Sequence, residues 1–99
     1  LKLCEDTIRY GTQEVFVDCP TREKGQYLGD AFISGRAQAI LTGDATLLKK
    51  AIVDFCNSAF ISAGIMAVST SSFMQEIADY SLLFAPLVLW AYRFFLRLF

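Results

Sequence analysis

The chain has 99 residues, of which 55% are hydrophobic and 19% charged, and its formal net charge is −1. This length allows at most one small domain, and the interspersed charges form no Lys/Arg cluster that could follow a phosphate backbone, which excludes nucleic-acid binding. Three Cys and no His exclude the usual zinc constellations and a Cys–His nucleophile pair, and the odd number of thiols leads us to expect a cytoplasmic protein.

The first half of the chain predicts two helices separated by a loop. Residues 1–11 place apolar side chains at helical spacing and end near Gly11, which predicts a helix there. Residues 12–26 read as a loop with a short extended piece at 15–17. The second helix is predicted over 27–41. Gly43, just beyond its end, can adopt the left-handed conformation that stops a helix. The side chains expected to face inward are Leu1, Leu3, Cys4 and Ile8 in the first helix, and Ala31, Phe32, Ile33, Ala37, Ile40 and Leu41 in the second.

The second half predicts two more helices. Asp44 can accept a free amide two or three residues on, so it should cap a third helix over 45–62. The side chains expected to face inward there are Leu47, Leu48, Ile52, Phe55, Cys56 and Ala59. A last helix begins near Asp79, and Pro86 should kink it or mark a new start. Short loops between helices favour antiparallel helical hairpins, so the expected fold is all-α.

The chain is more apolar than a small self-contained domain usually is. It begins at Leu1, and its last residues lie inside an apolar run that ends at Phe99. We therefore expect residues 1–99 to be the N-terminal part of a larger helical domain, truncated at both ends. Such a fragment should self-associate through exposed apolar helix faces.

An acidic cluster between the first two helices is the main candidate site. Asp18, Glu23 and Asp30 lie within thirteen residues that also hold Arg22 and Tyr27. If the three carboxyl groups come close together, their repulsion should keep at least one of them protonated near neutral pH. A protonated carboxyl group can act as a general acid, and ionised neighbours can bind sugar hydroxyls.

Two interpretations of this cluster remain open on spacing alone. The carboxylates can form a capping and salt-bridge cluster at a helix N-terminus, or they can form a catalytic site whose aromatic Tyr27 offers a flat face to a sugar ring. Arg22 would favour the ionised form of any carboxyl group that it touches.

The run DCPTREKGQYLGDA resembles the signature of the bacterial α-L-rhamnosidases, glycoside hydrolase family 78. The family pattern is Asp-Cys-Pro, one variable residue, Arg-Glu, a short spacer with an aromatic, and Gly-Asp-Ala. The matching positions here are Asp18-Cys19-Pro20, Arg22-Glu23, Tyr27 and Gly29-Asp30-Ala31. Weaker likenesses follow in the family's order at Leu41-Thr42-Gly43-Asp44 and at Ile77-Ala78-Asp79-Tyr80-Ser81-Leu82. The aromatic is usually Trp in the family, so Tyr27 departs from the pattern.

The resemblance implies part of an (α/α)6 toroid that hydrolyses terminal α-L-rhamnosides with inversion and without a cofactor or metal. It implies that Glu23 is the general acid, that Asp18 and Asp30 bind sugar hydroxyls, and that Arg22 positions the acid or the sugar. Inversion also needs a second carboxylate across the sugar as the base. The family's base is a Glu far downstream, and none of the 99 residues matches it, so we expect the chain alone to be inactive.

Two further features have alternative interpretations. Cys19 lies inside the motif, but without His and with acids expected to raise its pKa, we interpret it as a small residue packed in a turn. Residues 82–99 hold only Arg93 and Arg97 as charges, which suggests a membrane-spanning or interfacial segment. We favour a buried barrel helix, and keep as the alternative function a non-catalytic helical module that docks on a membrane or partner through 82–99.

Overall fold

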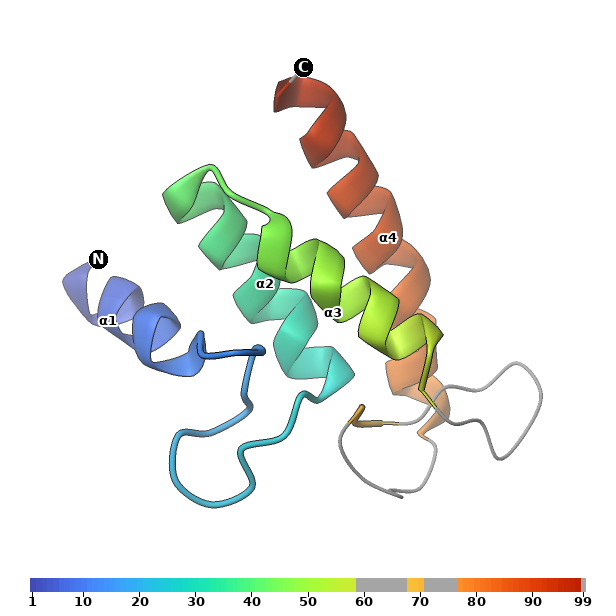
Figure 1. Ribbon diagram of the computed structural model, residues 1–99, viewed down its shortest axis with the longest axis horizontal. Helices are drawn as coiled ribbons and strands as arrows, with labels where there is room; N and C mark the ends of the chain where they lie inside the picture. The colour runs from blue at the N-terminus through green and yellow to red at the C-terminus, as the bar shows by residue number, and fades with distance from the viewer. Residues whose placement is uncertain (59–67, 71–76, 99) are drawn as a thin grey trace.

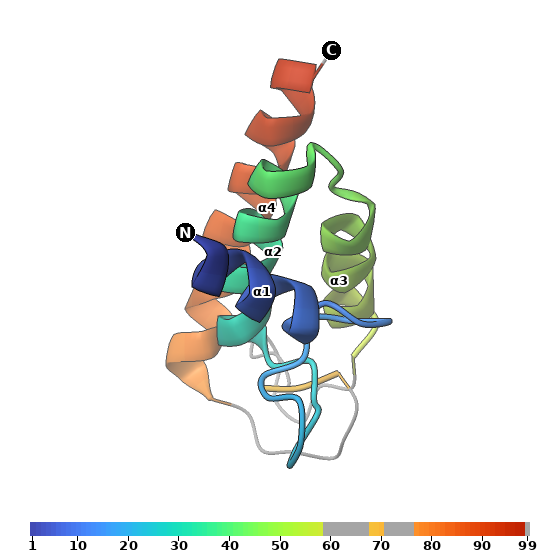
Figure 2. The same cartoon turned by 90° about the vertical axis from the view of Figure 1, so that its left-hand side faces the viewer.

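The computed structural model describes residues 1–58, 68–70 and 77–98. These residues form four α-helices, α1 (Lys2–Gly11), α2 (Leu28–Thr42), α3 (Thr46–Cys56) and α4 (Ala78–Leu98), and no strand. The all-α prediction is confirmed. Helix α2 contacts each of the other three helices, and α2 and α3 run antiparallel as a hairpin (Figure 1). In the second view, α2 lies between α3 and α4 (Figure 2).

The turn between α2 and α3 forms at Gly43 and Asp44 as predicted, although the N-cap residue of α3 is Ala45 and not Asp44. Gly43 ends α2 with φ of 71°, and its N–H donates to the carbonyl of Ala39 at 2.9 Å. Oδ1 of Asp44 accepts the Thr46 N–H at 2.8 Å and the Thr46 hydroxyl at 2.6 Å. These two hydrogen bonds lower the pKa of Asp44. A left-handed glycine followed by a capping carboxylate therefore reverses the chain within three residues.

The core lies where α2 meets α3 and α4. Its fully buried large side chains include Phe16 from the loop, Leu48 and Phe55 from α3, and Leu87 from α4. Helix α2 contributes mostly small residues to this core. A Cβ on Gly35 would lie 2.7 Å from Cδ1 of Leu48 and 3.1 Å from Cε2 of Phe16, so α3 and the loop pack directly against the α2 backbone.

This close packing explains where the predicted inward faces are wrong. Ile33 and Ile40 of α2 are 69% and 66% exposed, because the buried face of α2 consists instead of Leu28, Ala31, Gly35 and Ala39. On α1, no residue is buried, and Leu1, Leu3 and Cys4 are exposed. Helix α1 contacts α2 alone among the described helices. The helical spacing of the apolar residues in α1 therefore predicted a buried face that the fold does not cover.

Two predicted boundaries also change. Helix α3 ends at Cys56 rather than residue 62, and the Ser58 hydroxyl donates to the carbonyl of Phe55 at 2.7 Å just beyond that end. Cys56, expected inside, is exposed, while Ala59 lies outside the described residues. Helix α4 continues through Pro86 as one helix, so Pro86 does not mark a new start. Among the described residues, no helix has the length and hydropathy needed to cross a membrane.

Candidate functional site

The acidic loop closes on itself through Asp18 and Gly25. The backbone N–H of Asp18 donates to the Gly25 carbonyl at 3.0 Å, and the Gly25 N–H donates to Oδ1 of Asp18 at 2.9 Å. Between them, the Glu23 N–H donates to Sγ of Cys19 at 3.3 Å, and Lys24 adopts a left-handed φ of 51°. The motif thus folds as a compact turn within the loop predicted over residues 12–26.

The far end of this loop is fixed to other elements. The Leu28 N–H donates to the Val68 carbonyl at 3.1 Å, and the Thr70 N–H donates to the Gln26 carbonyl at 3.2 Å. Gln26 is fully buried, and its Nε2 donates to Oδ2 of Asp54 at 3.1 Å and to Oγ1 of Thr70 at 3.0 Å. Helix α3 and the 68–70 segment therefore hold the loop against the start of α2.

Glu23 lies within this loop with two side-chain partners. The Tyr27 hydroxyl donates to Oε2 of Glu23 at 2.6 Å, and the Arg22 guanidinium forms an ion pair with Oε1. The Glu23 side chain is 30% exposed and that of Arg22 is 82% exposed. The hydrogen bond from Tyr27 to Glu23, helped by desolvation and by the negative charges of Glu23 and Asp18, raises the pKa of Tyr27 to about 12.

Asp30 shows that the three carboxyl groups influence one another. It lies half-buried in the first turn of α2. Burial raises its pKa first, the charge of Asp18 adds to that rise, and the charge of Glu23 contributes less. The charges of Asp18 and Glu23 therefore add to the effect of burial on the pKa of Asp30. Glu23, to which the resemblance assigns the acid role, is instead held by Tyr27 and Arg22.

The environment of Cys19 differs from the prediction. Backbone N–H groups of Lys24, Glu23 and Arg22 around its sulfur lower the pKa of the thiol, while desolvation and the neighbouring Asp18 act in the opposite direction. Asp18 acts in the predicted direction, but the expectation of a raised pKa is wrong overall, because the amide dipoles of the turn outweigh Asp18.

Tyr80 is a neighbour of the site that sequence reasoning did not identify. A Cβ on Gly29 would lie 2.9 Å from Cζ and 3.1 Å from the hydroxyl oxygen of Tyr80. The phenol of Tyr80, from the first turn of α4, therefore packs over the start of α2 beside Asp30. The sequence signal for this contact was Gly29, since a glycine allows another group to lie close to the backbone. It does not indicate which group that is.

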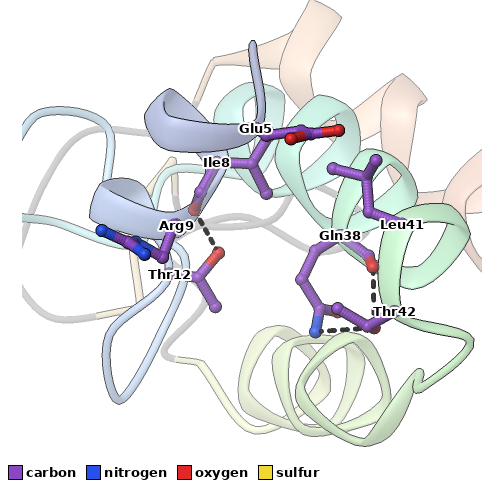
Figure 3. Close-up of a pocket in the computed structure, with 7 residues that line it drawn as sticks. All are labelled: Glu5, Ile8, Arg9, Thr12, Gln38, Leu41 and Thr42. Carbon is purple, nitrogen blue, oxygen red and sulfur yellow. Dashed lines mark hydrogen bonds between the residues drawn. The ribbon is translucent and has the colours of Figure 1, made fainter. Parts of the chain in front are cut away.

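A separate pocket lies at the C-terminal part of α2, whereas the acidic cluster lies at the start of that helix. It has a volume of about 330 Å³ between α1 and the C-terminal part of α2, and Figure 3 shows its lining. The lining residues are Glu5, Ile8, Arg9, Thr12, Gln38, Leu41 and Thr42. None of the predicted site residues takes part in it.

Neither a metal-binding cluster among the described residues nor a similar known protein identifies the function of this site. Among residues 1–58, 68–70 and 77–98, no group of three or more His, Cys, Asp or Glu side chains is arranged to hold a metal ion. No family model, curated protein or solved structure matches this chain. The assignment of roles to Asp18, Arg22, Glu23, Tyr27 and Asp30 therefore stays a prediction that depends on the motif and on the geometry above.

Proposed function

We propose that this chain carries the general-acid half of an inverting glycosidase site that removes terminal α-L-rhamnose from rhamnosides. The observation that supports the proposal is the geometry of the loop, in which the Gly25 N–H donates to Oδ1 of Asp18 and the Tyr27 hydroxyl donates to Oε2 of Glu23, with Asp30 following in the first turn of α2. Helices α1–α4 are then the first helices of an (α/α)6 toroid.

The roles follow from what each side chain can offer a sugar. When the sugar displaces Arg22 from Oε1 of Glu23, that oxygen takes up a proton from solvent and then passes it to the departing glycosidic oxygen, while Asp18 and Asp30 accept hydrogen bonds from the hydroxyls of the rhamnose ring. Arg22 is exposed and bonded to Oε1 of Glu23, so an incoming sugar can displace it without disturbing the core. Tyr27 holds Oε2 of Glu23 and thereby fixes the direction in which the acid points.

The cytoplasmic location is part of the same proposal. All three cysteines, Cys4, Cys19 and Cys56, are free, which suits a reducing compartment.

The proposal is tested by sugar binding to the 99-residue chain and by turnover in the intact gene product. We expect the chain to bind L-rhamnose in a titration followed by nuclear magnetic resonance, with shifts confined to residues 18–30 and their neighbours. With an aryl α-L-rhamnoside, Glu23→Gln should lower kcat of the intact protein at least about a hundredfold. Glu14→Gln, which changes an exposed carboxylate in the same loop, should leave kcat unchanged. Turnover that survives Glu23→Gln would remove Glu23 from the acid role.

A second candidate function is a non-catalytic helical module that docks through residues 82–99. The observation that favours it is the exposure of Leu82, Leu89 and Leu96 along α4. Lack of L-rhamnose binding by the chain, together with retained association through α4, would favour this module over the glycosidase.

A further inference from the structure

Helix α4 carries an exposed apolar stripe on the side opposite the core. Leu82, Leu89, Tyr92 and Leu96 are 76%, 51%, 60% and 58% exposed, respectively. Ala78 and Ala85 are also exposed and complete the series. The α4 stripe is Ala78, Leu82, Ala85, Leu89, Tyr92 and Leu96.

The spacing of the α4 stripe is that of a helix that pairs with another helix. Its members follow one another at intervals of four, three, four, three and four residues, which is the alternation of the a and d positions of a heptad. The opposite side of α4, with Leu87 and Ala91, is buried against the core. The stripe is therefore a second seam, separate from the one that holds α4 to this fold.

We infer that two copies of this chain associate through the α4 stripe with their α4 helices antiparallel. In that arrangement a positions face d positions of the second copy. Leu82 then faces Tyr92, Ala85 faces Leu89, and Ala78 faces Leu96, each pair occurring twice about a two-fold axis. A small residue faces a large one in two of the three kinds of layer, as close helix packing requires.

The charges beside the stripe support this partner and this direction. Asp79 and Arg93 are both exposed and both follow a d position by one residue, so they lie on the same edge of the seam. In the antiparallel pair, Asp79 of one copy and Arg93 of the other are offset by two residues, or about 3 Å along the axis. The same contact repeats by symmetry, so the surface is self-complementary.

Other arrangements lack this complementarity. A parallel pair would place each Arg93 near Val88 of the second copy, and the position facing each Asp79 would lie before the start of α4, so the two charges would not meet at the seam. None of the motif residues lies on the α4 stripe, so the test of the dimer and the test of sugar binding can fail separately.

Sedimentation equilibrium of the 99-residue chain over a wide concentration range tests the inference. We expect a monomer–dimer equilibrium that Leu89→Glu, at the centre of the stripe, abolishes. Arg93→Asp alone should weaken the dimer by roughly tenfold, because it places like charges together twice. The double variant Asp79→Arg with Arg93→Asp should restore it. These two positions are exposed, so the charge variants leave the core intact.

Ile33→Glu provides the matched control, since Ile33 is 69% exposed on α2 and should not affect the dimer. A chain that stays monomeric at all concentrations would overturn the inference. If Arg93→Asp leaves the dimer unchanged, or if the double variant fails to restore it, the inference is overturned in favour of unspecific apolar contact. A monomer that binds phosphatidylcholine vesicles through α4 would overturn it in favour of a lipid surface.

Discussion

The hydroxyl of Tyr27 donates a 2.6 Å hydrogen bond to Oε2 of Glu23, four residues earlier in the chain. This bond is the largest cause of the rise in the pKa of Tyr27 to about 12 from its usual value of 10.0. The proton stays on the phenol because the phenolate could not donate and would face the negative charge of Glu23. The bond therefore links the orientation of the proposed acid to the ionisation of a tyrosine.

Glu23→Ala should lower the pKa of Tyr27 towards 10, because both the acceptor and its charge disappear. Titration of phenolate absorbance in the ultraviolet measures this, with Tyr27→Phe identifying the contribution of Tyr27 among the four tyrosines. The folded-state pKa is the higher one, so the stabilisation due to this bond is present below about pH 10 and is lost as the pH rises through about 12. A Tyr27 titration unchanged by Glu23→Ala would contradict the bond.

The ionisation of Asp30 should change the stability of the fold with pH in the opposite direction from that of a salt-bridged carboxylate. Burial and the charges of Asp18 and Glu23 raise its pKa above 3.8, so the folded chain holds this proton more tightly than the unfolded chain. Its contribution to stability is therefore present at low pH and is lost as the pH rises through the raised value. We expect Asp30→Asn to stabilise the fold at pH 7 by less than about 1 kcal/mol, since solvent screens this half-exposed group, and to lose this advantage in acid.

The carboxyl ¹³C shift of Asp30, followed against pH, reports its pKa directly. Asp18→Asn keeps an oxygen that can accept the Gly25 N–H but removes the charge, so it should move the pKa of Asp30 down towards 3.8. A pKa of Asp30 that does not respond to Asp18→Asn would show that the two carboxyl groups do not share a region.

Cys19 should react with iodoacetamide at a lower pH than is usual for a thiol. The amides of Lys24, Glu23 and Arg22 lower its pKa, and the thiolate is the reacting species. The rate of alkylation against pH, resolved by mass spectrometry of peptides, measures this. Gly25→Pro removes the N–H that closes the loop on Asp18, so it should loosen the turn and shift the profile of Cys19 to higher pH. If Gly25→Pro leaves the pH dependence of Cys19 alkylation unchanged, the turn is not what lowers the pKa of this thiol.

The sequence predicted those features that depend on neighbours along the chain. Gly43 and Asp44 form the expected turn because a left-handed glycine and a capping carboxylate act within a few residues. The pattern of apolar residues did not predict that Ile33 and Ile40 face solvent, since it cannot show that α2 is packed closely enough to need Gly35. It also could not pair Gly29 with Tyr80, which lies 51 residues later and reaches the site only through the tertiary packing of α4 on α2.

Gly29→Ala tests that tertiary contact. The new Cβ would lie 2.9 Å from Cζ of Tyr80, which is too close, so either the phenol or the first turn of α2 must move. We expect unfolding in urea to show a loss of about 1–3 kcal/mol, the usual cost of overpacking. The matched control is Gly11→Ala, whose Cβ would meet only the Val17 carbonyl at an ordinary 3.7 Å. That control should be neutral or slightly stabilising.

Tyr80→Leu combined with Gly29→Ala separates the contact from a general intolerance of alanine at position 29. If the phenol is what the new methyl group meets, the double variant should recover part of the stability that Gly29→Ala loses, because the shorter side chain leaves room for it. Equal losses for Gly29→Ala in the parent and in the Tyr80→Leu background would mean that the backbone of α2, and not Tyr80, requires glycine. Recovery would instead establish that α4 reaches over the start of α2 beside Asp30, where the proposed sugar site is formed.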